Sequence, residues 1–485
     1  MLLTDRSSYF SNAAAFTHKE IMLMADEPRT TVIERRSIDF IPHAERHGSP
    51  FSLFTLWFAG NMQITTIVTG ALAVVLGLSL TWALVAIVVG NCLGGIVMAL
   101  HSAQGPRMGI PQMIQSRAQF GFYGAILPIV LVIIMYIGFF ASSGVLGGQA
   151  LSAWTGLPVT PSIIIVSVVC TLLAIFGYDL IHRYASIVSL LFLIGFVYLT
   201  IRLLIGNNLA HASAGSPFSP GTFLLVISIM ATWQITYGPY VADYSRYLPE
   251  NTKIGATFWW TFGGSVISSI WMMAFGSIAV FVAASQFNSN SVTFVVQQSG
   301  AGFSGIIFLL VILGIIAANV LNVYGIFLTT TTAVTALQRF RSSMTSRLVF
   351  VLAAGVIGTL VAVLGQGNFV NNYTTFLLFL LYLIIPWSAV NLVDFYLLRH
   401  ERYNIDAIFD PNGMYGAVNW RALVAYVVAI LLEVPFMSSS IYTGPMVGIL
   451  GGADISWIVG LIVASVLYYV LMRPLISATA KEGIG

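Results

Sequence analysis

Long apolar segments follow one another through most of the chain, and they constrain its fold more than any other feature. A helix needs roughly 20 apolar residues to cross a bilayer, and by this length the sequence predicts twelve membrane-spanning helices. We expect them near residues 51–77, 79–101, 121–151, 161–178, 185–205, 221–244, 256–284, 303–334, 347–365, 372–396, 420–440 and 454–473. With 58% hydrophobic and 8% charged residues, the composition excludes a soluble globular domain. The predicted fold class is an all-α polytopic membrane protein.

The positive charges are distributed unevenly over the predicted loops. Of the 20 Lys and Arg residues, only Arg202 falls near the side opposite the chain termini. Because cytoplasmic loops are enriched in these residues, we expect both termini in the cytoplasm and the protein in the cytoplasmic (inner) membrane. The basic residues form no stripe, so the sequence does not indicate a nucleic-acid partner. The expected partners are membrane lipid and a small-molecule solute, and the expected state is a monomer.

Two predicted spans are interrupted by residues that disfavour a helix. The first span carries Gly60, Asn61 and Gln63, and the sixth carries Trp233-Gln234 followed by Tyr237-Gly238-Pro239-Tyr240. In hydrocarbon, unwound backbone persists only where it lines a cavity or is buried in protein. Interrupted spans at corresponding places of two halves are therefore typical of a transporter with a binding site at the membrane midplane.

The interruptions also predict the domain organisation. If spans one to five and six to ten are two units with an odd number of spans, the second unit must be inverted in the membrane. The predicted parts are a cytoplasmic N-terminal segment (1–50), a first five-helix repeat (51–205), a second, inverted repeat (206–396), two flanking helices (397–473) and a cytoplasmic tail (474–485).

Aromatic and amide side chains near the interruptions are candidates for binding a flat heterocycle. Aromatic faces supply stacking, and amides supply hydrogen bonds to its edges. In span three, Phe139 and Ser143 are four residues apart and share a helix face. The candidate substrate-binding residues are Gln63, Phe139, Ser143, Trp233, Gln234, Tyr237, Asn319 and Asn322. Alternatively, Asn61 and the other amides hydrogen-bond neighbouring helices, and the aromatic rings belong to the ordinary core.

Glu433 is the acidic residue that lies well inside a predicted span, the eleventh, with no basic residue near it in sequence. An acid at such a depth is a candidate for proton coupling, although span eleven lies outside the predicted repeats. The sequence has no HExxH, Walker or GxSxG motif and no clustered His/Cys set, so we expect neither an enzyme nor a bound cofactor or metal.

Seven motifs together resemble one family of transporters. They are IERRSIDFIP, WFAGNMQ, GPRMGIPQMIQSRAQFG, FGYDLIHRY, YVADYSRYLP, AANVLNVY and NLVDFYLLR. The chain resembles the nucleobase–cation symporter-1 family, in its purine–cytosine permease branch. This resemblance implies a LeuT-like five-plus-five inverted repeat with two C-terminal helices, alternating access, and uptake of a heterocycle driven by Na⁺ or H⁺. It places substrate contacts at Gln63, Phe139, Ser143, Trp233 or Gln234 with Tyr237, and Asn322 with Asn319 beside it.

The chain departs from the family pattern at the expected cation site. Ile316 and Ala317 stand where sodium-coupled members have adjacent hydroxyls, which leaves backbone carbonyls near Ala59 and Met62 as the remaining cation ligands. We therefore expect a symporter that imports cytosine or a purine with H⁺ rather than Na⁺. The alternatives are an allantoin, hydantoin or vitamin-type transporter coupled to Na⁺, and, in a different class, a channel or a transporter-like nutrient receptor.

Overall fold

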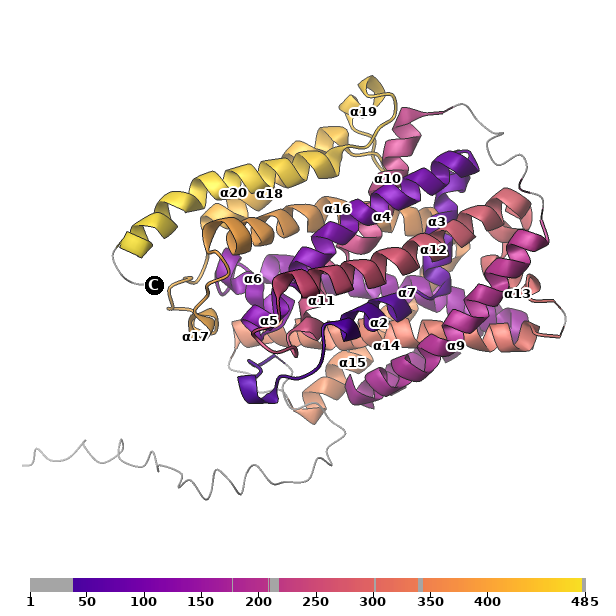
Figure 1. The fold of residues 1–485 in the computed structure, drawn as a ribbon, viewed down its shortest axis with the longest axis horizontal. Helices are drawn as coiled ribbons and strands as arrows, with labels where there is room; N and C mark the ends of the chain where they lie inside the picture. Colours follow the sequence, from indigo (N-terminus) through magenta and orange to yellow (C-terminus); the bar gives the residue numbers. More distant parts are fainter. Residues whose placement is uncertain are drawn as a thin grey trace, which may run out of the picture.

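Helices form almost all of the described molecule. The computed structural model describes residues 38–481 except 177, 208, 210–217, 301 and 339–342, and within this part the only β pairing is one isolated bridge between Ser438 and Thr443. Most of the long helices run side by side along one common direction (Figure 1). The helices α5 (Gly105–Met108), α6 (Gln112–Phe120) and α17 (Ile405–Ile408) gather at the end of the bundle near the C terminus, and α13 (Ser291–Gln297) lies at the opposite end.

The helices coincide with the predicted apolar segments. The long elements are α2 (Phe51–Gly60), α3 (Ile64–Val75), α4 (Leu80–Ser102), α7 (Ile126–Thr155), α8 (Val159–Phe176), α9 (Tyr178–Ile205), α10 (Pro220–Ile235), α11 (Gly238–Ser245), α12 (Ile254–Ser289), α14 (Ser304–Leu337), α15 (Met344–Gly365), α16 (Phe369–Leu392), α18 (Trp420–Glu433) and α20 (Ser456–Lys481). The short ones are η1 (His43–Glu45), α5 (Gly105–Met108), α6 (Gln112–Phe120), α13 (Ser291–Gln297), η2 (Gln366–Asn368), η3 (Val393–Leu398), α17 (Ile405–Ile408), η4 (Val434–Phe436) and α19 (Pro445–Ile449).

The membrane character follows from the length and composition of these helices. In the described residues, seven helices are long and apolar enough to cross a membrane, and eight if α2 and α3 count as one bent span. Two more, Val159–Ile175 and Leu190–Ile205, are apolar but shorter. An all-helical, multi-pass membrane protein is thus confirmed, whereas the count of twelve spans stays a prediction.

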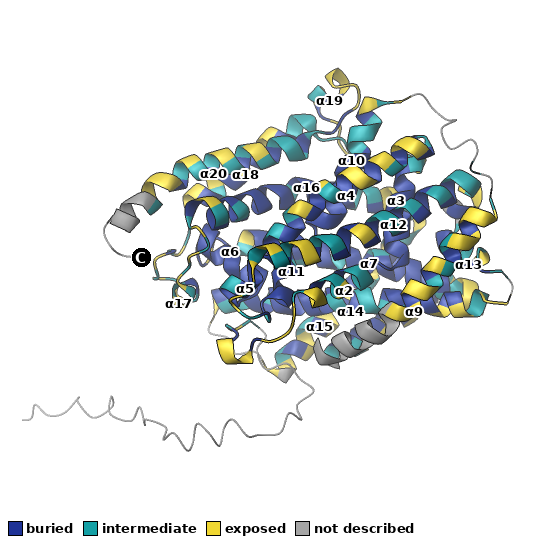
Figure 2. Cartoon of the chain, viewed as in Figure 1, coloured by how far each residue is buried: buried dark blue, intermediate teal, exposed yellow. Residues whose placement is uncertain are grey.

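Exposed apolar side chains cover the outer surface of the bundle. Leu190, Ile194 and Leu431 are each about 60% exposed on the outer helices, while the central helices are largely buried (Figure 2). Such an apolar exterior suits a hydrocarbon solvent rather than water.

The first predicted interruption is a sharp break. α2 ends at Gly60 and α3 begins at Ile64, with an angle of 67° between the two helices. Gln63 causes the change of direction because its backbone is extended, at φ −145° and ψ 158°. The residues that disfavour a helix therefore mark the break correctly.

The second interruption is milder than the first. α10 ends at Ile235 and α11 begins at Gly238, but Thr236 and Tyr237 keep right-handed helical dihedral angles. Pro239 lies in the first turn of α11, where a missing N–H breaks no helical hydrogen bond. Residues Pro220–Ser245 therefore form one span, without the bend that Gln63 imposes on span one.

Candidate functional site

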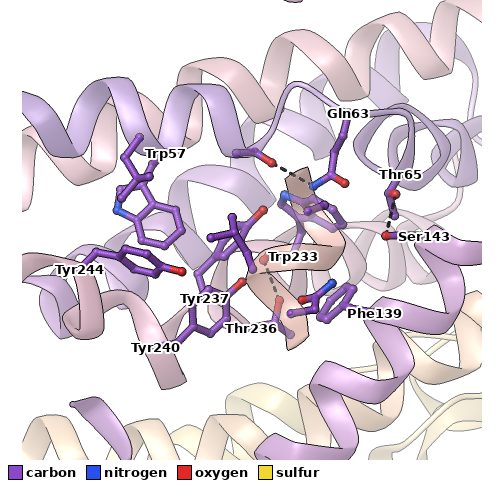
Figure 3. Close-up of a pocket in the computed structure, with 15 residues that line it drawn as sticks. Trp57, Gln63, Thr65, Phe139, Ser143, Trp233, Thr236, Tyr237, Tyr240 and Tyr244 are labelled. Carbon is purple, nitrogen blue, oxygen red and sulfur yellow. Dashed lines mark hydrogen bonds between the residues drawn. The ribbon is translucent and has the colours of Figure 1, made fainter. Parts of the chain in front are cut away.

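A cavity lies where the two interrupted spans meet. The space between its walls, including the part that is open to solvent, amounts to about 600 Å³. Its walls come from α2, α3, α7, α10, α11 and α14 and from the two interruptions. The lining residues are Leu56, Trp57, Gly60, Gln63, Thr65, Phe139, Ser143, Trp233, Thr236, Tyr237, Tyr240, Tyr244, Ala318, Leu321 and Asn322. Trp57 and Tyr244 lie at one side of the cavity, and Thr65 and Ser143 at the other (Figure 3).

Asn61 joins the two interruptions behind this cavity. Its Oδ1 accepts the indole N–H of Trp233 at 2.7 Å and the hydroxyl of Tyr237 at 2.9 Å. Its Nδ2 donates to the carbonyl of Trp57 at 2.9 Å and to Ser265 Oγ at 3.1 Å on α12. Asn61 is fully buried. Its contacts agree with the alternative in which this amide hydrogen-bonds neighbouring helices. Trp233 and Tyr237 therefore present ring surface to the cavity while their polar atoms are engaged.

Two polar atoms of the cavity wall have no partner within the described part of the chain. They are the buried Oε1 of Gln63 and Nε1 of Trp57, one acceptor and one donor. The Gln63 amide is held in place because Nε2 donates to the carbonyl of Gly60 at 2.9 Å. On α14, Asn322 Nδ2 donates to Asn319 Oδ1 at 3.2 Å. A ligand bearing both donors and acceptors would satisfy these groups, and unpaired buried groups are costly otherwise.

The aromatic rings are set at steep angles to one another. Phe139 lies edge-to-face with Trp233, with ring centroids 6.0 Å apart and an interplanar angle of 90°. Trp57 lies 5.2 Å from Tyr237 at 56°. Trp233 and Tyr237 are also edge-to-face, at 6.0 Å and 89°. Edge-to-face contacts are a preferred arrangement of aromatic rings, and they fix the orientation of the rings that line the cavity.

The structure brings six of the eight predicted residues to the cavity: Gln63, Phe139, Ser143, Trp233, Tyr237 and Asn322. Gln234 lies outside the lining, where Nε2 donates to Asn91 Oδ1 at 3.0 Å and Oε1 accepts from Ser265 Oγ at 2.6 Å. Asn319 also lies outside it, donating to the carbonyl of Phe140 at 3.1 Å. Trp233 is thus the residue of the Trp233-Gln234 pair that reaches the cavity.

Sequence reasoning missed several lining residues. The main ones are Trp57, Thr65, Thr236, Tyr240 and Tyr244. Two of them carried a signal: Trp57 lies one helical turn before the break at Gly60–Asn61, and Tyr240 follows Pro239 directly. An aromatic residue one turn from a helix break shares the face that the break exposes.

At the expected cation site, Met62 lies beside Gly314 of α14. A Cβ built on Gly314 of α14 would lie 3.6 Å from the carbonyl oxygen of Met62 and 3.4 Å from Phe192 Cζ. The carbonyl of Ala59 accepts the N–H of Met62 at 3.0 Å. Glu433, the other coupling candidate, ends α18, which contributes no residue to the cavity described above. The coupling ion stays a prediction.

Comparisons with known proteins agree with this geometry. Residues 40–460 match a family described as "Permease for cytosine/purines, uracil, thiamine, allantoin". The chain is 47% identical over 447 residues to the putative purine-cytosine permease YxlA of Bacillus subtilis, covering 91% of this chain and 96% of that protein. The chain belongs to the nucleobase–cation symporter-1 family, in its purine–cytosine permease branch. This is a family of permeases and not of enzymes.

More distant relatives include a second purine-cytosine permease and a transporter of known structure. The purine-cytosine permease fcyB of Emericella nidulans is 27% identical over 483 residues, covering 94% of this chain and 91% of that protein. Among solved structures, Mhp1, a nucleobase-cation-symport-1 transporter in a closed conformation with bromovinylhydantoin bound, has a TM-score of 0.75 at 21% identity. That match covers 92% of this chain and 96% of Mhp1, so the two proteins share their fold.

Proposed function

We propose that this permease is a secondary active symporter that imports a nucleobase, cytosine or a purine, together with a proton. The single observation that carries the proposal is the cavity at the two interrupted spans, which combines aromatic residues in its wall with the Gln63 Oε1, unpartnered among the described residues. A nucleobase has a flat face for stacking and an edge with donors and acceptors. The names of the 47% and 27% identical relatives support the same substrate class.

The transport cycle follows from the arrangement of the spans. We propose twelve spans, with residues 51–205 and 206–396 as inverted repeats, 397–473 as flanking helices and both termini in the cytoplasm. The two interruptions then meet near the midplane, and the repeats rock about the bound base to expose it to each side in turn. Asn61 would serve as the fixed connection between the interruptions during this motion, because it hydrogen-bonds Trp233 and Tyr237.

Proton coupling is supported by the residues around the expected cation site. Ile316 and Ala317 contribute no side-chain oxygen, and the Met62 carbonyl faces Gly314 and Phe192. Sodium ions take several hard oxygen ligands. A protonatable side chain elsewhere in the bundle would then carry the coupled charge.

Uptake of radiolabelled cytosine and adenine into proteoliposomes tests the proposal. Asn322→Ala should abolish uptake while leaving a monodisperse, folded protein, because it removes an amide from the cavity wall. The matched control is Asn412→Ala, whose side chain is exposed in a loop. Normal cytosine and adenine uptake by Asn322→Ala would refute the site.

The response of uptake to imposed ion gradients identifies the coupling ion. It also distinguishes a symporter from a channel or a receptor. Accumulation above the equilibrium ratio should follow an imposed inward proton gradient, persist without Na⁺ and disappear with a protonophore. A channel would equilibrate the base without accumulation, and a receptor would bind it without transport.

Hydantoins and related heterocycles are the second candidate substrates. They are favoured by the bromovinylhydantoin bound to Mhp1 and by the allantoin and thiamine that the family description names. A competition panel of cytosine, adenine, allantoin and benzylhydantoin against labelled substrate distinguishes the two classes.

A further inference from the structure

A buried carboxyl group lies apart from the cavity, at the seam between α18 and α20. Glu433 ends α18 and is fully buried. Among the described residues, neither of its carboxyl oxygens has a hydrogen-bond partner. The carboxyl packs directly on Gly460 of α20, and a methyl group at position 460 would overlap with it. An ionised carboxylate in such a place would be desolvated without compensation, so the structure favours the protonated acid.

A second buried carboxyl nearby has the opposite environment. Asp454, also fully buried, precedes α20 and accepts four hydrogen bonds. Oδ2 accepts the hydroxyl of Tyr382 at 2.6 Å and the N–H of Ser438 at 2.8 Å. Oδ1 accepts the N–H of Ser456 at 3.0 Å and its hydroxyl at 2.6 Å. The Asp454 carboxyl is thus surrounded by donors, whereas the Glu433 carboxyl has no hydrogen-bond partner among the described residues.

The two carboxyl groups lie within electrostatic reach of each other. The other titratable groups around Glu433 are Tyr382 on α16 and Tyr426 on α18, whose hydroxyl donates to the carbonyl of Leu383 at 3.0 Å. In the part of the chain that the structure describes, no Lys, Arg or His forms an ion pair with Glu433. The two neighbouring carboxyls therefore differ in their surroundings: Asp454 is fully hydrogen-bonded, and Glu433 is buried without a partner among the described residues.

Hydrogen bonds connect this pair to the moving parts of the proposed cycle. The carbonyl of Asp454 accepts the hydroxyl of Ser228 on α10 at 3.3 Å. α10 ends at the interruption and carries Trp233 into the cavity. Tyr382, the donor to Asp454, belongs to α16. A shift of α16 would change the donors around the Asp454 carboxyl, and a shift of α10 would change the hydrogen bond to its backbone carbonyl.

We propose that Glu433 carries the coupled proton, and that its neighbour Asp454 connects this seam to α10 and α16 through the hydrogen bonds from Ser228 and Tyr382. This inference rests on the proposed proton symport and assigns its proton-binding residue. The Glu433 carboxylate takes a proton from water on the uptake side, and the neutral acid is buried during the conformational change. The proton leaves to water on the other side when the seam opens, so that one charge moves inward with each base.

The test distinguishes the effect of the shape of the Glu433 side chain from the effect of its ability to bind a proton. Glu433→Gln keeps the shape of the neutral acid and cannot titrate, whereas Glu433→Asp keeps the carboxyl and shortens the chain. The variants are reconstituted in proteoliposomes with the membrane potential clamped and an inward gradient of one pH unit. Labelled cytosine and a luminal pH dye report base accumulation and proton entry. Asp406→Asn, an exposed acid on α17, is the control.

One-to-one coupling sets the expected sizes, because one pH unit corresponds to a tenfold concentration ratio. Wild-type protein and Asp406→Asn should approach about tenfold accumulation. Glu433→Gln should fall to a ratio of about one with no proton entry, while still exchanging labelled for unlabelled cytosine. Glu433→Asp should retain accumulation with a shifted pH dependence.

Accumulation by Glu433→Gln equal to that of the wild type would overturn the assignment and leave the proposed function intact. Loss of accumulation in Glu433→Asp together with retained accumulation in Glu433→Gln would also overturn the assignment. In that case only the shape of the side chain would matter. Absence of cytosine and adenine transport by the wild type would instead refute the proposed function itself.

Discussion

Asn61 Oδ1 accepts hydrogen bonds from two aromatic residues of the cavity wall, Trp233 at 2.7 Å and Tyr237 at 2.9 Å. The acceptor lies in the break of span one, and both donors belong to span six. One buried amide thus fixes the relative position of the two interruptions. It also orients two rings before any ligand arrives, which lowers the cost of ordering the site on binding.

Asn61→Ala should destabilise the protein and impair uptake. The substitution leaves the indole N–H and the phenol hydroxyl buried without an acceptor, at a cost of about 1–3 kcal/mol for each group. We expect a clear fall in the melting temperature of the detergent-solubilised protein and a loss of most cytosine uptake. Asn372→Ala, an exposed amide of α16, is the control; equal melting temperatures for the two variants would contradict the role of Asn61.

Ser143→Ala should weaken substrate binding and leave stability almost unchanged. Ser143 lines the cavity, and its only hydrogen bond within the described residues is a long one, 3.4 Å, to Thr65 Oγ1. Loss of one hydrogen bond to a neutral ligand group costs about 0.5–1.5 kcal/mol, so the KM for cytosine should rise roughly two- to tenfold.

The neighbouring serine supplies the control for this measurement. Ser142 donates to the carbonyl of Gly138 at 2.8 Å on its own helix and does not line the cavity. Ser142→Ala should therefore leave the KM unchanged. A similar rise of KM in both variants would indicate a general disturbance of α7 rather than a substrate contact by Ser143.

Local pattern was sufficient to locate the helices and the first break. Apolar length positioned the spans, and Gly60 with Gln63 marked the place where α2 gives way to α3. The same local reasoning overestimated the interruption of span six, because Pro239 falls in a first helical turn where it disturbs no hydrogen bond. Similar residue types occur at a helix break and at the start of a helix, so residue type alone does not distinguish the two.

Long-range partners decided the rest of the site. Gln234 and Trp233 are adjacent in sequence, but successive helix positions diverge by about 100°, and Asn91 and Ser265 draw the Gln234 amide away from the cavity. The alternative that Asn61 hydrogen-bonds neighbouring helices does not say which ones, and its partners lie in span six and α12. Nothing local in the sequence could reveal these pairings.

Phe139→Leu should raise the KM for a stacked base. Phe139 is 9% exposed, into the cavity, and meets Trp233 edge-to-face. An aromatic contact contributes about 0.5–1.5 kcal/mol beyond its buried area, which corresponds to a two- to tenfold change in affinity. Phe379→Leu, at a position 57% exposed on the surface of α16, should not change the KM. An unaltered KM in Phe139→Leu would argue against stacking on this ring.

The contact between α3 and α12 should tolerate no added methyl group. A Cβ at Gly276 of α12 would overlap with the carbonyl of Ile67, and a Cβ at Gly70 of α3 would overlap with the backbone of Met273. Overpacking costs about 1–3 kcal/mol where side chains can yield, and here the obstacle is backbone. We expect Gly276→Ala to lower the melting temperature strongly and to reduce the yield of monodisperse protein.

Gly255, on the same helix, provides the matched comparison. No atom lies within 4 Å of a Cβ built there, and alanine is favoured over glycine within a helix by about 1 kcal/mol. Gly255→Ala should therefore keep or slightly raise the melting temperature. Because both variants add one methyl group to α12, their difference isolates the close approach to α3, which places the second half of span one beside the cavity. Equal melting temperatures of the two variants would show that α3 and α12 can move apart without loss of stability.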